Sequence, residues 1–214
     1  MKQFVLVLML SIMMVPMNSF AQSEQDSAAV MEKLQKLYEM LQNEDSLKVL
    51  QQAFNEAQTI REICGIPFGT EYQKAKDILY NKYGYPDYNP DRTHVVYQNK
   101  KYAGMDFGSI HFLFQSDGYK SYMNGAVFII EADNLAEARK IQEMLYKKLD
   151  EKYVMMSDED ENGNTIWKGG LSPTDEMTYG FMIGIMKYDK SLQPKHPYCV
   201  RLFYGPYNYV KEEF

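Results

Sequence analysis

The stretch Ser109–Ala132, SIHFLFQSDGYKSYMNGAVFIIEA, decides the fold of this 214-residue chain. Apolar side chains alternate with others over residues 109–115, which is typical of a strand with one buried face. The apolar positions are Ile110, Phe112 and Phe114. The sequence Ser-Asp-Gly that follows favours a turn, and residues 125–132 form a second run rich in β-branched and aromatic residues. We therefore expect neighbouring antiparallel strands that share an apolar face.

Helical and strand patterns flank this stretch on both sides. Before it, residues 71–83 have helical spacing and end at Gly84, residues 93–98 read as a strand, and residues 99–101 read as a turn. After it, residues 134–152 predict a long helix with an apolar stripe. Further strand candidates then follow at 153–157, 164–169, 180–188 and 198–205.

The order of these elements suggests an internal duplication. A helix followed by three hairpin-connected strands is expected in each half, over residues 63–132 and 133–214. The matched positions are Ala75 with Ala138, Tyr97 with Trp167, Phe112 with Ile183, and Val127 with Val200. An antiparallel sheet with one apolar face needs a cover, which one helix in each half supplies. The predicted fold class is α+β, with helices packed on a sheet formed from duplicated three-stranded units.

The N-terminus has the pattern of an export signal. Lys2 precedes an apolar run over residues 4–15, and small residues at Ser19 and Ala21 fit a cleavage site after Ala21. Residues 1–21 are therefore predicted to be a signal peptide, which makes the mature chain periplasmic or secreted. No later segment is apolar over 18 residues, so no transmembrane segment is expected after cleavage.

Residues 22–62 are predicted to form a helical segment ahead of the α+β domain at 63–214. Two apolar stripes at helical spacing run through residues 30–57, separated by a break at 43–46. These stripes need a cover. Packing on the domain, docking on a partner and self-association through residues 30–57 are all consistent with the pattern.

Charge and composition exclude several classes of partner. Removal of Lys2 leaves 22 basic and 29 acidic residues, a net charge of −7 with neutral histidines. A net acidic chain argues against binding to nucleic acid through phosphates and against docking on anionic lipid. Hydrophobic residues make up 45% of the sequence, which is enough for a sizeable core.

Known catalytic and cofactor motifs are missing from the sequence. Cys64–Gly84 contains three glycines but matches no phosphate loop, so its glycines are expected to shape the fold. His94, His111 and His196 have no metal-ligand spacing, and alternation places His111 opposite Ile110, toward solvent. No G-x-S-x-G sequence occurs. We predict no catalytic residue, no cofactor and no zinc site.

Residues 158–164, DEDENGN, partly match a calcium-binding loop. Asp158, Asp160 and Asn162 stand at the spacing of its first ligands, but Gly169 occupies the position of the closing glutamate. The alternative is a hairpin with a turn at Asn162-Gly163. Weak calcium binding and a simple turn both remain as interpretations.

Cys64 and Cys199 are the two cysteines of the sequence. Export would place them in an oxidising compartment, where a Cys64–Cys199 disulfide can form. Two separate buried thiols are the alternative.

Tyrosines are abundant in the predicted loops and near the C-terminus. A tyrosine buries a large apolar area while keeping a polar hydroxyl, which suits contacts with proteins or sugars as well as packing at sheet ends. The positions in question are Tyr83, Tyr85, Tyr88, Tyr119, Tyr122, Tyr204, Tyr207 and Tyr209.

Four stretches carry a resemblance that covers residues 64–214: GIPFGTEYQKAKDILYNKYG, VVYQNKKYAGMDF, IHFLFQSDG and LFYGPYNY. Together they resemble uncharacterised exported proteins of Bacteroides-type gut bacteria, a resemblance that implies no activity. The order of helix and strands distantly resembles the fold of β-lactamase-inhibitor protein and of SmpA/OmlA-like lipoproteins, with Gly69-Thr70 and Gly84-Tyr85-Pro86 standing for the family signature. The lipid-anchor cysteine of that family is missing. A TATA-binding-protein-like duplication is an equal topological alternative.

These observations favour an exported, non-catalytic protein of the bacterial envelope that binds another envelope protein or a glycan. The alternative is a secreted or periplasmic hydrolase whose site is assembled from dispersed residues. A polar cleft around His111 would favour the hydrolase, whereas exposed aromatic side chains would favour binding.

Overall fold

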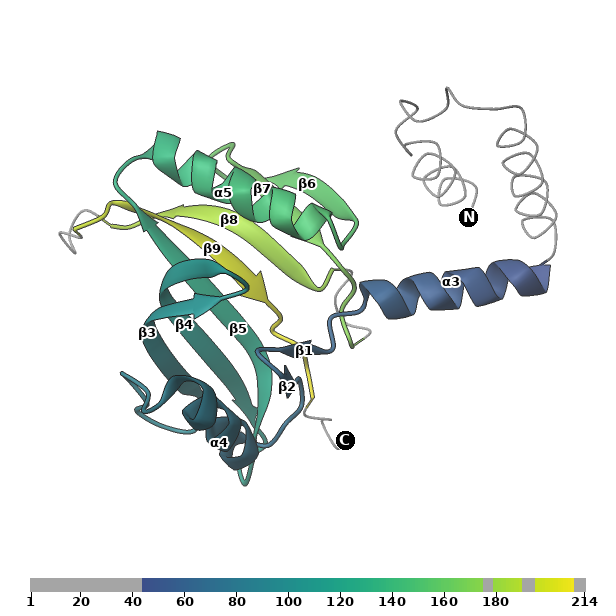
Figure 1. The fold of residues 1–214 in the computed structure, drawn as a ribbon, viewed down its shortest axis with the longest axis horizontal. Coiled ribbons are helices and arrows are strands. Elements are labelled where there is room, and N and C mark those ends of the chain that lie inside the picture. Colours follow the sequence, from purple (N-terminus) through teal and green to yellow (C-terminus); the bar gives the residue numbers. More distant parts are fainter. Residues whose placement is uncertain (1–43, 175–178, 190–194, 210–214) are drawn as a thin grey trace, which may run out of the picture. The chain divides into compact units, whose positions relative to one another are not determined.

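The structure is a computed structural model that describes residues 44–174, 179–189 and 195–209 (Figure 1). The first residues in this range form helix α3 (Glu44–Gln58), and contacts divide the chain into two units whose boundary lies within α3, between Ala53 and Phe54. The remaining elements belong to the second unit. They are β1 (Glu62–Ile63), β2 (Ile66–Pro67), α4 (Tyr72–Tyr83), β3 (His94–Tyr102), β4 (Met105–Ser116), β5 (Ser121–Ala132), α5 (Leu135–Asp150), β6 (Met155–Glu159), β7 (Thr165–Gly169), β8 (Phe181–Lys187) and β9 (Tyr198–Tyr204).

Seven strands form one antiparallel sheet in the order β3-β4-β5-β9-β8-β7-β6. Helix α4 precedes the meander β3-β4-β5, and α5 precedes β6-β7-β8-β9. The two meanders join through the pairing of β5 with β9, which brings Phe128 opposite Leu202. Both helices pack against the sheet, α5 along β8 and β9 (Figure 1). The predicted α+β class, with helices on an antiparallel sheet, is confirmed.

The prediction of two equal three-stranded units was wrong. The second half, 133–214, contributes four strands, because Met155–Glu159 pairs with Thr165–Gly169 as an edge strand. This strand, β6, has no counterpart in the first half, 63–132. The seven strands also form one continuous sheet, since every residue of β9 pairs with a residue of β5.

The predicted turn at 99–101 was also wrong. Strand β3 continues to Tyr102, and the two-residue turn is Ala103-Gly104, closed by the pairing of Tyr102 with Met105. Both turn residues have positive φ, 49° and 78°, which matches the twist of a two-residue hairpin. Asn99, at φ 50°, distorts the strand without reversing it.

The glycines of Cys64–Gly84 shape the backbone, as expected. Gly84 ends α4 with φ 81°, and its N–H donates to the carbonyl of Tyr80 at 2.8 Å. Gly69 has φ 83°, and its N–H donates to the carbonyl of Met123 at 2.7 Å. A Cβ on Gly69 would lie 2.9 Å from the ring of Tyr209. The N–H of Gly69 is thus occupied by a hydrogen bond to strand β5.

Helix α5 begins at a side-chain cap and buries one polar residue. Asn134 Oδ1 accepts a hydrogen bond from the N–H of Glu137 at 2.9 Å, as a helix N-cap does. Ala138 and Leu145 face the core. Gln142 is also buried, and its Nε2 donates to the carbonyl oxygens of Thr165 at 2.6 Å and Ile183 at 3.3 Å. These bonds fix α5 over the second meander.

The strand register separates the sheet into two faces. Directly opposed residues of antiparallel strands share a face, so the pairing defines rows of side chains across the sheet. One row faces the helices, where Tyr83 of α4 packs on its first member and Tyr146 of α5 on its last. This covered row consists of Tyr97, Ile110, Phe128, Leu202, Ile183 and Trp167. All but Trp167 are buried, and they form the centre of the core.

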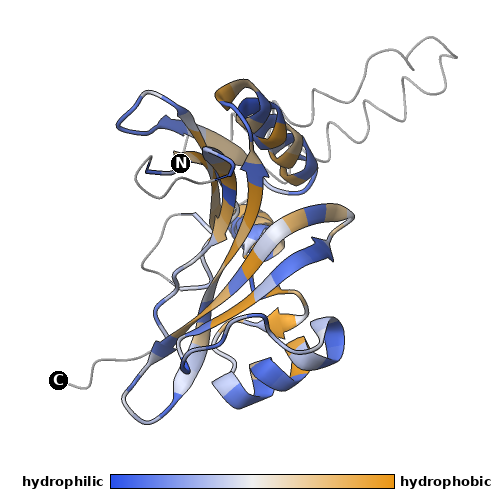
Figure 2. Cartoon of the chain, turned by 90° about the vertical axis from the view of Figure 1, so that its left-hand side faces the viewer, coloured by the Kyte–Doolittle hydropathy of each residue, from blue (hydrophilic) through white to orange (hydrophobic). Residues whose placement is uncertain are grey.

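Hydrophobic residues concentrate along the middle of the strands (Figure 2). Just after β9, Tyr207 is buried in the core, and its hydroxyl donates a hydrogen bond to the carbonyl of Gly180. Among the helices that the structure describes, none has both the length and the apolar character needed to cross a membrane.

Candidate functional site

The other face of the sheet is the candidate functional site, and we call it the open face. Its central row runs across all seven strands, and the contacts of α4 and α5 described above lie on the opposite side. The row consists of Val96, His111, Val127, Phe203, Met182, Lys168 and Met156. Val127, Phe203 and Met182 are half-buried, whereas their neighbours in the covered row are fully buried. The open face is therefore apolar at its centre without being filled.

Three side chains form a hydrogen-bonded chain at one side of the open face. Ser109 Oγ lies 3.0 Å from His111 Nε2, and His111 Nδ1 lies 3.0 Å from His94 Nε2. Ser109 and His111 are two positions apart on β4, so both point to the same side, and β3 supplies His94. The ring of Tyr88, which is 56% exposed, packs edge-on against His94.

The electrostatic surroundings keep His111 neutral. Burial, then His94 and then the positive charge of Arg201 lower the pKa of His111 to about 4. Its imidazole is thus uncharged at pH 7. Either ring nitrogen can carry the hydrogen, so the hydrogen bonds that link Ser109, His111 and His94 can run in either donor-to-acceptor direction. The carboxylate of Asp91 accepts a hydrogen bond from the backbone of His94. Over the described residues, the side chains of Ser109, His111 and His94 form no hydrogen bond or ion pair with a carboxylate.

Arg201 lies on β9, opposite Ile129 of β5 and Gly184 of β8, and its side chain belongs to the open face. Two positions away on the same face, Cys199 is buried, and its thiol is hydrogen-bonded to the hydroxyl of Tyr188. Burial and this contact raise the pKa of Tyr188 well above its usual value. The open face therefore carries two polar groups. Ser109, His111 and His94 form the first, and Cys199 with Tyr188 forms the second.

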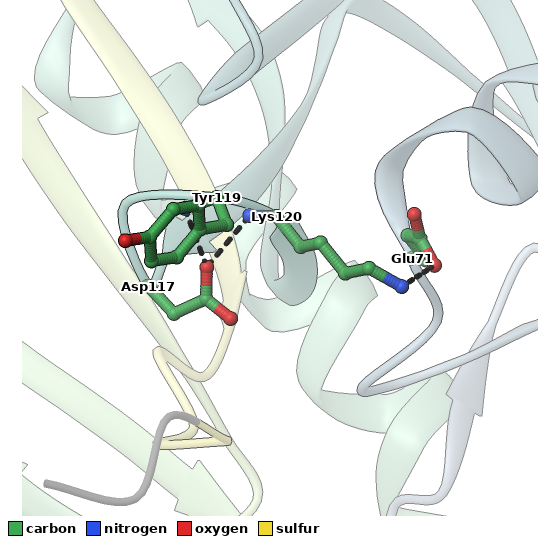
Figure 3. Close-up of polar contacts among 4 residues, drawn as sticks. All are labelled: Glu71, Asp117, Tyr119 and Lys120. Atoms are coloured by element: carbon green, nitrogen blue, oxygen red, sulfur yellow. Dashed lines mark hydrogen bonds and ion pairs between the residues drawn. The ribbon is translucent and has the colours of Figure 1, made fainter.

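A third polar feature lies at the tip of the β4–β5 hairpin (Figure 3). Asp117 Oδ1 accepts hydrogen bonds from the N–H groups of Tyr119 at 2.8 Å and Lys120 at 2.6 Å, and these bonds lower the pKa of Asp117. Lys120 Nζ reaches Glu71 at the start of α4, at 3.1 Å. A hollow of about 220 Å³ lies here, lined by Glu71, Tyr72, Gln73, Arg92, Tyr119, Lys120 and Ser121.

The calcium candidates form a hairpin turn and do not gather their oxygens at one point. Asp160 Oδ1 accepts from the N–H groups of Asn162 at 2.9 Å and Asn164 at 2.8 Å, with Gly163 at φ 73°. Asp158 lies in β6 and pairs with Lys168 at 2.6 Å. Over residues 44–174, 179–189 and 195–209, no group of three acidic, histidine or cysteine side chains could hold a metal ion.

The Cys64–Cys199 disulfide is not formed, because both thiols are free and buried at separate places. Cys64 lies in the β1–β2 turn, and its Sγ lies 3.3 Å from the hydroxyl of Tyr83. Burial raises the pKa of Cys64 to about 11, so its thiol stays protonated at neutral pH.

The predicted tyrosines divide into packed and exposed sets. Tyr204 and Tyr207 are buried in the core, and Tyr83 and Tyr209 pack against it. The exposed ones are Tyr85 at 81%, Tyr88 at 56% and Tyr119 at 91%. Tyr122 is half-buried in β5, where its neighbour Met123 pairs with Phe114.

Sequence reasoning found His111 and its face but missed its partners. The spacing of Ser109 and His111 on one strand was a usable signal, since residues two apart share a face. His94 and Arg201 needed the strand register, and Arg201 needed the long-range pairing of β5 with β9. The predicted self-association segment, 30–57, lies outside the described residues up to position 43.

Comparison with known proteins gives no match to a family model, to a curated protein or to a solved structure.

Proposed function

We propose that this chain is an exported, non-catalytic binding protein of the bacterial envelope, and that the open face docks a partner protein. The observation that carries the proposal is the contrast between the two faces. One face of the sheet is filled by α4 and α5, while the row through Val127, Phe203 and Met182 is left half-buried. A half-buried apolar row on an otherwise well-packed sheet is typical of a surface that a partner completes.

The extent and chemistry of the open face favour a protein as the occupant. Seven strands at a spacing of about 4.8 Å make the central row about 29 Å long, the length of a helix of about 20 residues. Met182 and Met186 supply adaptable apolar contacts, and Phe203 supplies an aromatic contact near the middle. His111 in this row, and Ser109 and Arg201 in the adjacent row of the same face, are polar groups that would give a partner its register.

The predicted signal peptide, residues 1–21, supports the localisation. Cleavage after Ala21 would release a chain whose partners are other envelope proteins, and its net charge of −7 opposes the anionic membrane surface.

Site-specific photo-crosslinking of the mature chain tests the proposal. A benzophenone amino acid would replace Met182 on the open face and, as a matched control, Met144, which is 48% exposed on α5. In envelope extracts of the native bacterium, we expect one discrete adduct from position 182 and none of that size from position 144. Adducts of equal yield from both positions, or none from position 182, would contradict the proposal.

The hydrolase alternative rests on the chain of Ser109, His111 and His94. Acyl transfer to a serine requires the adjacent histidine to become an imidazolium, and a third group must stabilise that charge. Here burial and Arg201 oppose protonation of His111, and the third group is a histidine in place of a carboxylate. The geometry is that of a nucleophile with a base, but the electrostatics favour binding.

Ester hydrolysis separates these two functions. The binding proposal expects p-nitrophenyl acetate turnover that is equal for the wild type and for Ser109→Ala. A drop of about 100-fold in Ser109→Ala would favour the hydrolase.

A further inference from the structure

We propose that Arg201, together with the hydroxyl of Ser109, binds the carboxylate of an aspartate or glutamate side chain presented by the docked partner. This inference rests on the proposed function and names the group that the open face recognises.

The position of Arg201 makes it the central charge of the open face. It lies on β9, which pairs with β5 on one side and β8 on the other, so three strands or more separate it from either sheet edge. In register, Ile129 alone separates it from Ser109 of β4, and Cys199 lies two positions away on β9, so Arg201 stands between the two polar groups of this face.

Arg201 lacks a counter-charge within the described part of the chain. No ion pair or hydrogen bond of its guanidinium is formed there, and its Nε is shielded from solvent without an acceptor. The acid nearest to it in register is Glu131, which lies two positions from its paired residue Ile129 and points to His196 at 3.6 Å. A buried N–H without an acceptor, such as this Nε–H, is a costly arrangement unless a ligand supplies one.

Open space lies beside Arg201. Gly184 is its direct partner on β8, and a Cβ built there would meet no atom within 4 Å. A glycine at the centre of a strand weakens the sheet, so its presence opposite the arginine suits the approach of a ligand group.

The hydrogen-bond chain on the other side can supply a second donor. If His94 Nε2–H donates to His111 Nδ1, then His111 Nε2–H donates to Ser109 Oγ, and the Ser109 hydroxyl hydrogen is free to donate outward. Neutral His111 permits this direction of the chain. An anion between Arg201 and Ser109 would select it, because the reverse direction commits the Ser109 hydrogen to His111.

The charge balance favours a carboxylate over a phosphate. One guanidinium with one neutral donor, the Ser109 hydroxyl, compensates a single negative charge, and the planar fork of arginine matches a carboxylate. A dianion would leave an excess negative charge near Glu131. A side chain of the partner is the source that fits a site in the middle of a protein-docking surface.

Nuclear magnetic resonance titration of the mature chain tests the subsite without a partner. The amide resonances of His111 and Gly184 report on acetate, with acetamide as the neutral isostere and inorganic phosphate as the dianion. We expect saturable shifts with acetate, none with acetamide, and weaker binding of phosphate than of acetate. The acetate Kd should rise at least tenfold in Arg201→Gln and severalfold in Ser109→Ala, and stay unchanged in the matched control Arg139→Gln, which removes an exposed arginine from α5.

Failure of those shifts with acetate, tighter binding of phosphate, or an unchanged acetate Kd in Arg201→Gln would overturn the inference. Arg201→Lys, which keeps the charge, is the second variant if Arg201→Gln does not fold, and it should weaken acetate by losing the fork. If galacturonate bound more than tenfold tighter than acetate, the recognised carboxylate would belong to a glycan and not to a side chain of a partner protein, which would overturn the inference.

The crosslinking assay distinguishes this inference from the proposed function. The adduct from position 182 should fall at least tenfold in yield in Arg201→Gln. Saturable acetate binding without any adduct from position 182 would contradict the proposed function but leave the carboxylate subsite intact. If the yield of the adduct from position 182 were high and unchanged in Arg201→Gln, only the carboxylate subsite would be contradicted.

Discussion

The two faces of the sheet are built from the same strands but are completed differently. On β5, Phe128 faces the helices and is fully buried, while its neighbour Val127 faces the other way and is half-buried. On β9, Leu202 and Phe203 show the same contrast. Both faces carry large apolar side chains, so hydrophobicity alone does not explain the difference. What differs is the cover, since α4 and α5 fill one face.

This difference separates stability from recognition. The covered face holds aromatic contacts such as Phe107 with Phe128 at 5.1 Å between ring centroids. The open face holds polar side chains that hydrogen-bond from strand to strand, and an arginine whose Nε has no acceptor among the residues that the structure describes. Substitutions on the first face should therefore act on folding, and substitutions on the second face should act mainly on binding.

Truncation of matched phenylalanines should give the largest contrast. Phe128→Ala removes a fully buried ring from the core and is expected to lower the free energy of unfolding by about 3–5 kcal/mol. Phe203→Ala, on the adjacent strand but the open face, should cost about 1 kcal/mol. Urea denaturation of both variants measures the difference. Equal losses would show that the open face is part of the core.

Removal of the buried amide should come next. Gln142→Ala leaves the carbonyls of Thr165 and Ile183 without this donor and should destabilise the fold by about 1–3 kcal/mol. Gln73→Ala, which removes an exposed amide from α4, is the matched control and should change stability by less than about 0.5 kcal/mol. A similar urea midpoint for the two variants would contradict the role given to Gln142.

Acid should weaken the fold through His111. Its pKa of about 4 in the folded chain lies below the ~6.5 of an unfolded histidine, so the unfolded state binds the proton first as pH falls. The stability contributed by neutral His111 is complete above about pH 6.5 and is lost between there and about pH 4. Because the ring is partly exposed, we expect about 1 kcal/mol.

Comparison with His111→Gln isolates this effect from the carboxylates that titrate in the same range. The free energy of unfolding should fall less between pH 7 and pH 4.5 in the variant than in the wild type. A parallel fall in the two proteins would show that His111 titrates normally.

The hairpin tip should give the smallest effect. Tyr119 is 91% exposed and lies on neither face of the sheet, so Tyr119→Ser should change stability by less than about 0.5 kcal/mol. It should also leave the position-182 adduct unchanged. Loss of that adduct in Tyr119→Ser would move the binding site toward the hollow near Glu71.

Local patterns predicted the elements well and their assembly less well. Alternation identified Ile110, Phe112 and Phe114 as one face, and helical spacing with Asn134 identified α5, because these signals lie within one element. A strand was expected at 153–157, close to β6, but it was left out of the predicted three-stranded unit, because a five-residue strand with exposed side chains has little pattern. The pairing of β5 with β9, which joins the two halves of the sheet, was not predicted because these strands are far apart in sequence.

The candidate site shows the same limit. His111 was placed on the correct face by its alternation with Ile110, but His94 and Arg201 reach it only through the pairing of β3, β4, β5 and β9. Gln142 stands among the apolar positions of α5, and its burial depends on carbonyls of other strands that no local pattern reveals.

The most direct test places a charge at the centre of the open face. Phe203→Lys should lower the yield of the position-182 adduct at least tenfold while the protein stays folded, since the half-buried side chain lies outside the core. An unchanged adduct in a folded Phe203→Lys protein would contradict the claim that this face receives a partner.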